Sequence, residues 1–436
     1  VNVDQFFGIE IEEFPAQIAQ VALWLVDHQM NLRVSVEFGL YFARIPLKSS
    51  PQIRHANALR LDWNEVLPAE RCSYVLGNPP FLGKTYQSKE QKADLAAVMH
   101  GIHGAGAVAL GLGAVALGGG AYFGVVAGDR VVAWLPNSIE AVEIMLGAAS
   151  LGAVFSSASP DFGANGVTDR FGQIEPKVLV AVDGYRYNGK DFDCLERLTQ
   201  IRAGLPTLVA TILVKNVSVG EHSREGLLDY EKFVSSGLSS PVAPQRFEFD
   251  HPWYVLYSSG TTGVPKCIVH RTGGVLIQHM KEHQLHCNLG QDDRVMYFTT
   301  TGWMMWNWLV SVLASGATAV LFDGAPTAPN TARLFDIVDS EKITLLGVSA
   351  KYIDSVRKAG IEPRTSHNLN SLRTICSTGS PLSPEGFDWV YTSVKQDVHL
   401  SSISGGTDLC ACFVGGDPTR PLYRGEIQGP MLGMAS

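Results

Sequence analysis

Charged residues are missing from one long part of the sequence, residues 95–128, and basic residues are nowhere in clear excess. The whole chain has 34 Lys and Arg against 42 Asp and Glu, a formal net charge of −8. Its first hundred residues carry 9 basic and 11 acidic side chains. Binding to a nucleic-acid backbone needs a basic surface that neutralises phosphates. The composition therefore gives no indication of a nucleic-acid partner.

Cysteine is also scarce, with seven residues in 436 and no repeating spacing. The closest pair, Cys410 and Cys412, forms C-x-C rather than the C-x-x-C of zinc and thioredoxin-like sites. We therefore expect a reduced, cytoplasmic protein. No basic segment followed by an apolar core opens the chain, so we expect no signal peptide. Because the chain opens on Val1 rather than Met, we expect its N-terminus to be incomplete.

The sequence does have two regions with an α/β pattern, and its 46% of hydrophobic residues can form a real core. The first region predicts strand, helix, strand and strand at residues 3–11, 15–31, 53–59 and 72–81. The second begins with a predicted strand, helix and strand at residues 128–138, 138–152 and 153–159. Similar units recur to the end of the chain. The predicted fold class is therefore α/β in both regions.

The clearest chemical motif is YSSGTTGVPK at residues 257–266, directly after the strand-like WYVL. Its glycines leave backbone N–H groups free to bind phosphate oxygens, and Lys266 adds a positive charge. The Walker pattern G-x-x-x-x-G-K-[ST] is absent. A flexible surface loop of the same composition is the alternative. The ordered string favours a phosphate-binding loop whose hydroxyl groups come from Ser258, Ser259, Thr261 and Thr262.

This loop is one of several strings that occur in a familiar order, including GDRVVAWLPN, FTTTGWMMWNW, ICSTGSPLSPEGFDWVY and SISGGTDLCACFVGG. In that order the chain resembles the AMP-forming acyl- and aryl-CoA synthetases of the acyl-adenylate-forming superfamily, and within it the acetoacetate-activating enzymes. The resemblance covers nearly all of residues 124–436 and implies an incomplete copy of the family's large N-terminal α/β domain. It also implies a two-step ligase. A carboxylate attacks the α-phosphate of Mg²⁺-ATP, and the thiol of coenzyme A then displaces AMP from the acyl-adenylate.

The resemblance also implies roles for individual residues. The β- and γ-phosphates of ATP would be held by Ser258, Ser259, Gly260, Thr261, Thr262, Gly263 and Lys266. The adenine ring would be flanked and supported by Gly379, Ser380, Pro381, Ser404, Gly405 and Gly406. Thr407 would reach the α-phosphate, and Asp408 would bind Mg²⁺ where the wider superfamily usually has Glu. Trp303 would form a wall of the acyl pocket.

Two other clusters have more than one interpretation. The string WMMWNW is apolar enough to be core, so we expect Trp306 and Trp308 to pack inside and only Trp303 to face a substrate. His279, His283 and His286 have the spacing of one helix face, which suits either a metal site or a solvated surface. No carboxylate or fourth ligand is spaced to complete a metal site, so the spacing favours the solvated surface.

The family continues beyond GEIQGPMLGM into an aspartate that binds the ATP ribose, a hinge, and a small domain with the lysine that drives adenylation. The sequence, which ends at Ser436, contains neither this aspartate nor the hinge nor the small domain. We therefore expect this chain to bind ATP weakly and to turn over poorly. The implied substrates are acetoacetate or a similar short acid, ATP and coenzyme A, with Mg²⁺ as the metal.

The first region contains LGNPPFLG at the end of an apolar strand. An amide oxygen and a backbone carbonyl can accept the hydrogens of an adenine amine while an aromatic ring stacks on the flipped base. With GIEIEEFPAQIA and HANALRLDW, this region resembles, over residues 1–95, the methyltransferase domain of large bacterial adenine DNA methyltransferases. The resemblance assigns ribose binding to Glu10, a contact with the adenine of S-adenosylmethionine to Asn57, and the catalytic tetrapeptide to Asn78, Pro79, Pro80 and Phe81.

The Gly/Ala tract at residues 103–120 is open to three interpretations. The tract is long enough for a membrane span. However, it holds seven glycines, each costing about 1 kcal/mol of helix propensity, and it has no Lys, Arg or Trp close to its ends. A dinucleotide loop matches G-x-G-x-x-A twice but follows no clear strand. The favoured interpretation is a junction at 99–123 between a methyltransferase-like 1–98 and an AMP-binding 124–436, with no membrane partner. A nucleotide-binding fusion of two unrelated reading frames stays open as an alternative to both enzymes.

We expect the first region not to bind S-adenosylmethionine with micromolar affinity. The family's first strand and glycine loop, which hold the methionine end of this cofactor, would precede Val1. Calorimetric titration of S-adenosylmethionine into residues 1–98 measures this directly. Micromolar binding would contradict the expectation.

Overall fold

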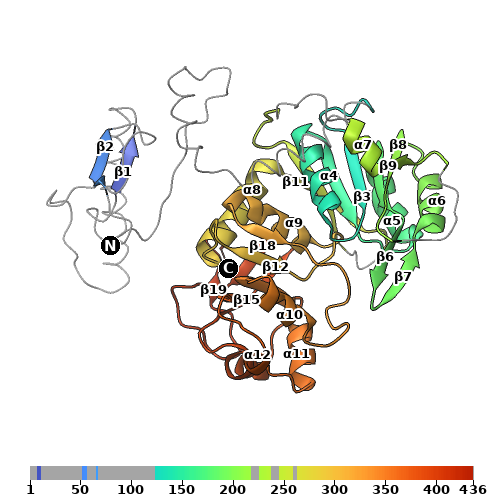
Figure 1. Cartoon of the computed structure of the whole chain (residues 1–436). Helices are drawn as coiled ribbons and strands as arrows, with labels where there is room; N and C mark the ends of the chain where they lie inside the picture. Colours follow the sequence, from blue (N-terminus) through green and yellow to red (C-terminus); the bar gives the residue numbers. More distant parts are fainter. Residues whose placement is uncertain are drawn as a thin grey trace. The chain divides into compact units, whose positions relative to one another are not determined.

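The computed structural model describes residues 7–10, 52–55, 65–66, 123–217, 225–236, 245–258 and 263–435. The chain divides into two compact units, Val1–His103 and Gly104–Ser436. In the first unit, strand β1 (Phe7–Glu10) pairs in parallel with β2 (Gln52–His55) (Figure 1). These strands confirm two predicted extended segments. The predicted helix at 15–31 and the predicted strand at 72–81 lie outside the described residues.

The second unit contains a seven-stranded sheet in the order β11-β10-β4-β3-β5-β8-β9. All neighbours are parallel except β10 and β11, which form an antiparallel hairpin. The strands are β3 (Arg130–Trp134), β4 (Val154–Ala158), β5 (Val178–Val182), β8 (Ala210–Val214), β9 (Leu228–Asp229), β10 (Pro252–Ser258) and β11 (Lys266–Arg271). The accompanying helices are α4 (Ile139–Ser150), α5 (Ala164–Phe171), η4 (Gly172–Ile174), α6 (Leu195–Ala203) and α7 (Tyr230–Ser236). A small hairpin, β6 (Gly184–Tyr187) with β7 (Lys190–Asp193), stands apart from this sheet.

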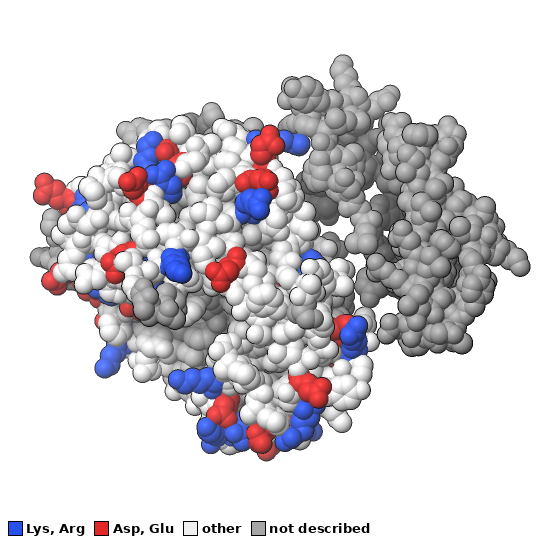
Figure 2. Space-filling model, turned by 180° about the vertical axis from the view of Figure 1, so that it is seen from behind, with Lys and Arg blue, Asp and Glu red and all other residues white. Residues whose placement is uncertain are grey.

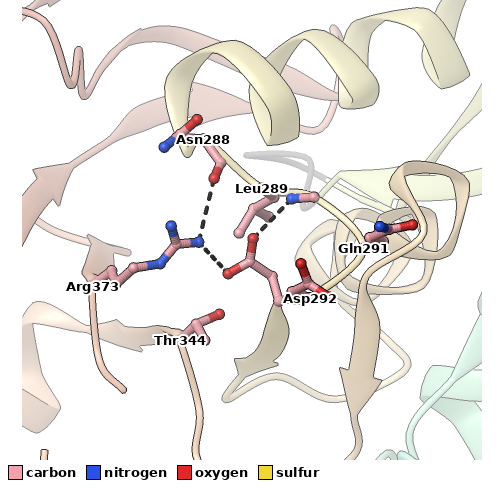
Figure 3. Close-up of a pocket in the computed structure, with 8 residues that line it drawn as sticks. Asn288, Leu289, Gln291, Asp292, Thr344 and Arg373 are labelled. Atoms are coloured by element: carbon pink, nitrogen blue, oxygen red, sulfur yellow. Dashed lines mark hydrogen bonds and ion pairs between the residues drawn. The ribbon is translucent and has the colours of Figure 1, made fainter. Parts of the chain in front are cut away.

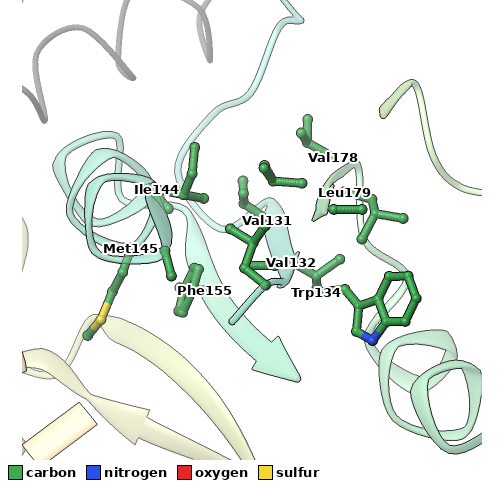
Figure 4. Packing of buried hydrophobic residues seen from close by; sticks show 14 of the residues in the cluster. Val131, Val132, Trp134, Ile144, Met145, Phe155, Val178 and Leu179 are labelled. Carbon is green, nitrogen blue, oxygen red and sulfur yellow. The ribbon is translucent and has the colours of Figure 1, made fainter. Parts of the chain in front are cut away.

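The core of this sheet follows from the spacing of its apolar residues (Figure 4). Helix α4 buries Ala141, Ile144, Met145 and Ala148, which have the i, i+3, i+4, i+7 spacing of one helix face. Strands β4 and β5 are buried along their whole length, as central parallel strands covered on both faces must be. The predicted strand, helix and strand at the start of this region are confirmed by β3, α4 and β4.

A second, five-stranded parallel sheet has the order β13-β12-β14-β15-β16. Its strands are β12 (Arg294–Tyr297), β13 (Thr318–Val320), β14 (Leu345–Ser349), β15 (Thr374–Thr378) and β16 (His399–Ser402). The helices from residue 272 onward are α8 (Thr272–Lys281), η5 (Glu282–His286), α9 (Met304–Val310), η6 (Ser311–Ser315), α10 (Arg333–Ser340), α11 (Ala350–Lys358), α12 (Pro363–Ser366), α13 (Pro384–Trp389) and η7 (Val390–Val394). A three-stranded antiparallel sheet, β17 (Ser404–Gly406), β18 (Ala411–Gly415) and β19 (Gly429–Pro430), completes the unit.

Charges of both signs are interspersed on the face of the second unit shown in Figure 2. Surface ion pairs of this unit include Arg357 with Asp354 and Arg424 with Asp388. Within the described ranges, no helix is both long and apolar enough to cross a bilayer. The Gly/Ala tract at 103–120 lies outside those ranges.

A test of this packing uses Gly347 on β14. A Cβ there would lie 2.0 to 2.4 Å from ring atoms of Tyr297 on neighbouring β12, and that ring is itself fixed edge-on against Trp308. We expect Gly347→Ala to lower the free energy of unfolding by about 1–3 kcal/mol through overpacking. Gly274→Ala in α8, where a Cβ meets nothing within 4 Å, is the control and should be neutral or stabilising. Urea unfolding followed by tryptophan fluorescence compares them, and equal stabilities would refute this packing.

Candidate functional site

The predicted site residues gather where parallel strands of the second sheet end. Trp303 follows β12, Gly379 follows β15, and Ser404 follows β16. Because the carboxyl ends of parallel strands lie at the same edge of a sheet, these three segments leave from one edge. Ligands of open α/β sheets bind at this edge.

Thr301 joins this edge to the first sheet. Its hydroxyl donates to the carbonyl oxygen of Leu135 at the end of β3, at 2.7 Å. Its own carbonyl accepts a hydrogen bond from the hydroxyl of Ser157 on β4, also at 2.7 Å. Both bonds are buried, so the carboxyl ends of the two sheets are held together.

The phosphate loop connects the β10–β11 hairpin. Ser258 and Lys266 are directly opposite each other in its register, and Lys266 is exposed. Gly263 has φ +110, a conformation that suits glycine, and a Cβ there would meet nothing within 4 Å. The strand predicted before the loop is confirmed by β10. Four of the predicted phosphate-binding residues, Ser259, Gly260, Thr261 and Thr262, lie outside the described residues.

The turn between β17 and β18 presents Thr407 and Asp408. It is closed by the N–H of Cys410, which donates to the carbonyl of Thr407 at 3.3 Å, and Cys410 itself has φ +52. Asp408 is exposed, and within the described part of the chain no ion pair engages it. An accessible carboxylate that keeps its oxygens free suits a hard cation such as Mg²⁺.

His270 on β11 shows that the hairpin and this turn lie together. It is 6% exposed. Burial lowers the pKa of His270, while the Thr407 carbonyl and the Asp408 carboxylate beside it act in the opposite direction. Side chains two and four residues apart on a strand share a face, so Lys266 points to the same side of β11 as His270. Lys266 is then about 13 Å further along the strand.

The two segments predicted to contact adenine are neighbours. The N–H of Ile403 donates to the carbonyl of Ser377 at 2.9 Å, which holds the start of β17 against the end of β15. Gly379, in the left-handed region at φ +84, turns the chain directly after β15, and Ser380 and Pro381 beside it are exposed. In β17, a Cβ on Gly405 would lie 2.0 Å from the carbonyl oxygen of Ala411, so only glycine fits there. Adenine binding by these residues stays a prediction.

The tryptophan cluster divides as predicted. Trp306 and Trp308 are 0% and 3% exposed, and their indole N–H groups donate to Asn137 and Glu282, each at 2.9 Å. The expectation that they pack in the core is confirmed. Trp303, the residue that precedes α9, is 64% exposed.

Both interpretations of the three histidines are wrong. His279, His283 and His286 are 0%, 0% and 5% exposed, so they form no solvated surface. Among the described residues, no group of His, Cys, Asp and Glu has the geometry of a metal site. The helix face is instead covered by β18 and α9, and a spacing pattern is the same for a buried face as for an exposed one.

Two of these histidines and one carboxylate bind backbone groups of the β17–β18 hairpin and its continuation. His279 Nε2 lies 3.0 Å from the carbonyl oxygen of Cys410, and His286 Nδ1 lies 2.8 Å from that of Gly416. The Glu282 carboxylate accepts a hydrogen bond from the N–H of Cys412 at 2.9 Å. Burial raises the pKa of Glu282, although this hydrogen bond acts to lower it. Sequence reasoning missed Glu282 and Cys410, because no local pattern pairs residues some 130 positions apart.

A cavity of about 500 Å³ lies elsewhere, at the amino end of the second sheet (Figure 3). Asn288, Asp293, Thr344 and Arg373 are among its lining residues, and Arg373 forms an ion pair with Asp293. None of the predicted site residues lines it. The converging segments at the carboxyl edge, rather than this cavity, form the candidate site.

The chain belongs to the AMP-binding enzyme family, whose model matches residues 120–434. This confirms the resemblance and the α/β adenylate-forming fold expected from the sequence. Residues 1–109 match the model of the MmeI DNA-methyltransferase domain, in agreement with the second resemblance. There Glu10 ends β1, while Asn57, Asn78, Pro79, Pro80 and Phe81 lie outside the described residues.

Within the family, its relatives include acetoacetyl-CoA synthetases. The enzyme of Rhizobium meliloti is 52% identical over 314 residues, which are 72% of this chain and 48% of that protein. Malonamoyl-CoA synthetase vrtB of Penicillium aethiopicum is 39% identical over 333 residues, 70% of this chain and 46% of that protein. The structure of acetoacetyl-CoA synthetase from Streptomyces lividans matches with a TM-score of 0.70 and 44% identity, covering 75% of this chain and 50% of that one. The chain thus spans about half the length of the relatives it matches.

The buried histidines predict a pH dependence of stability. Burial lowers the pKa of His279 to about 4, and the pKa of His283 also falls well below its usual value. Below pH 6.5 the unfolded chain therefore takes up protons before the folded one, so stability is full above pH 6.5 and is lost as the pH falls toward 4. Between pH 7 and 5 we expect the free energy of unfolding of His279→Gln to fall by roughly 2 kcal/mol less than that of wild type. Urea unfolding at both pH values checks this, and identical losses would contradict it.

Proposed function

We propose that the second unit belongs to an acid–thiol ligase that joins acetoacetate, or a similar short acid, to coenzyme A through an acyl-adenylate. The meeting of three segments carries the proposal: the Lys266 hairpin, the turn with Thr407 and Asp408, and the segment with Trp303. Identity of 52% to an acetoacetyl-coenzyme A synthetase supports it independently.

The first step, attack of a carboxylate on the α-phosphate of ATP, needs charge neutralisation and alignment more than a side-chain base. Lys266, exposed at the start of β11, supplies a positive charge for the β- and γ-phosphates. The hydroxyl of Thr407 donates to the α-phosphate. Asp408, with its free carboxylate, would hold Mg²⁺, which offsets the phosphate charge. Lys266 shares a face of β11 with His270, which lies beside Thr407 and Asp408, and this supports a triphosphate chain that runs between the two ends of β11.

The adenine and the ribose end of ATP would lie over the ends of β15 and β16. Gly379 and the glycines of β17 lack side chains, so the flat ring can approach the backbone closely. Ser380, Pro381 and Ser404 are exposed beside them. These placements support the predicted adenine segments.

The acyl substrate would contact Trp303. A large ring that is 64% exposed beside two buried tryptophans is available as an apolar wall. The relatives' names add the chemistry, because acetoacetyl and malonamoyl groups both carry a second carbonyl at the same distance from the thioester carbonyl. We infer that the substrate is a short acid with a carbonyl group at carbon 3.

The location and the domain division are part of the same proposal. All six cysteines in the described part of the chain are free, which supports a reducing, cytoplasmic setting. We propose residues 99–123 as the junction between a methyltransferase-related 1–98 and the ligase region 124–436. The match of residues 1–109 to a DNA-methyltransferase domain supports the methyltransferase relationship of this first region.

Calorimetric titration of the 436-residue chain with Mg²⁺-ATP tests the proposed function. We expect weak but measurable binding, and we expect Lys266→Ala to weaken it about 10- to 100-fold, because bonds to charged groups contribute about 1.5–3 kcal/mol. The control is Lys342→Ala at the opposite edge of the second sheet, where only a surface ion pair with Asp339 is lost. ATP–pyrophosphate exchange in the presence of acetoacetate then shows whether acetoacetate is the acid that is activated. Absence of ATP binding, or equal binding by Lys266→Ala, would refute the site.

A further inference from the structure

One helix fixes the backbone of the hairpin that carries Thr407 and Asp408. Residues 279, 282 and 286, spaced i, i+3 and i+7 along α8 and η5, bind backbone groups of residues 410, 412 and 416. The three contacts run along β18, from the residue directly before this strand to the residue directly after it. Lys281 adds a fourth, from its ammonium group to the carbonyl of Leu432 at 2.9 Å.

The most consequential of these contacts is the one at Cys410. A left-handed φ of +52 on a residue other than glycine is strained, so surrounding contacts must hold it. The side chain of Cys410 is completely buried against the hydroxyl of Tyr254, with 3.4 Å between oxygen and sulfur. Its carbonyl oxygen is bound by His279. This conformation closes the turn that presents Thr407 and Asp408.

His279 is itself fixed in one tautomer. A carbonyl oxygen can only accept, so Nε2 carries the proton and donates to Cys410. Nδ1 of the neutral ring is then an acceptor for the single hydrogen of the Ser311 hydroxyl, whose oxygen lies 2.9 Å from Nδ1 and 2.8 Å from the carbonyl oxygen of Asn307. A hydrogen-bond partner on each side of a buried ring determines its orientation.

The same segment of chain carries the phosphate-binding lysine. Lys266 begins β11, and α8 follows β11 directly at Thr272 with no loop between them. The distance between Lys266 and the Asp408 turn is therefore set by one continuous strand and helix. The helix ends in the π-helix η5, a rare geometry.

We propose that His279 is a positioning residue of the proposed ligase: by holding the Cys410 carbonyl it keeps Asp408 and Thr407 in place for Mg²⁺ and the α-phosphate. The inference rests on the proposed function, since it assigns the purpose of the same turn. His279 touches neither the nucleotide nor the metal.

The test compares ATP affinities of the full 436-residue chain with and without Mg²⁺. Wild type is expected to bind ATP more tightly with Mg²⁺, and His279→Leu to lose most of that gain, about 10-fold in affinity, while its affinity for metal-free ATP stays the same. His279→Gln, whose amide N–H reaches the same carbonyl, is expected to restore the gain. A purely structural role would lower both affinities equally and would not show this rescue.

His283→Leu is the matched control. His283 is as deeply buried on the same helix, but its ring packs edge-on against Trp308 and makes no hydrogen bond to the hairpin, so its loss leaves the turn intact. An unchanged Mg²⁺ gain in His279→Leu overturns the inference while leaving the proposed function standing. Lack of any Mg²⁺-dependent binding in wild type overturns both. Should His279→Leu not fold, His279→Asn, whose shorter amide does not reach the Cys410 carbonyl, replaces it, and an unchanged gain in that variant overturns the inference.

Discussion

The parallel direction of the strands is the constraint on which the candidate site depends. In both large sheets of the second unit every neighbouring pair is parallel except β10 with β11, so the connections after β12, β15 and β16 all leave from one edge. The two buried hydrogen bonds of Thr301 bring the corresponding edge of the first sheet to the same place. Residues that are far apart in the sequence, such as Lys266, Trp303 and Asp408, therefore share one region.

Buried polar side chains then fix the details of that region. A buried polar group is costly unless it is hydrogen-bonded, so each such group that binds a distant backbone specifies one arrangement. Thr301 does this between the sheets, and His279 and Glu282 do it for the Asp408 hairpin. Apolar packing alone would tolerate small displacements here, whereas a carbonyl bound at 3.0 Å does not.

Much of the site could be predicted from local sequence, but its supports could not. The glycine and hydroxyl pattern of residues 257–266 indicated a phosphate loop after a strand, and β10 precedes it as expected. The apolar neighbours of Trp306 correctly indicated core packing. The interpretation of His279 failed, because periodicity shows only that residues share a helix face. What covers that face is decided by segments some 130 residues further along.

The sequence by itself determined the α/β class through strand and helix periodicity, and the family through the order of its motifs. It also predicted a phosphate loop, from glycines that leave the backbone accessible and a lysine after a hydroxyl-rich loop. Only the tertiary structure decided that His279 is neutral and buried, that Cys410 adopts a left-handed conformation, and that β11 faces Asp408. These properties follow from burial and from hydrogen bonds between distant segments, which exist only once the chain has folded.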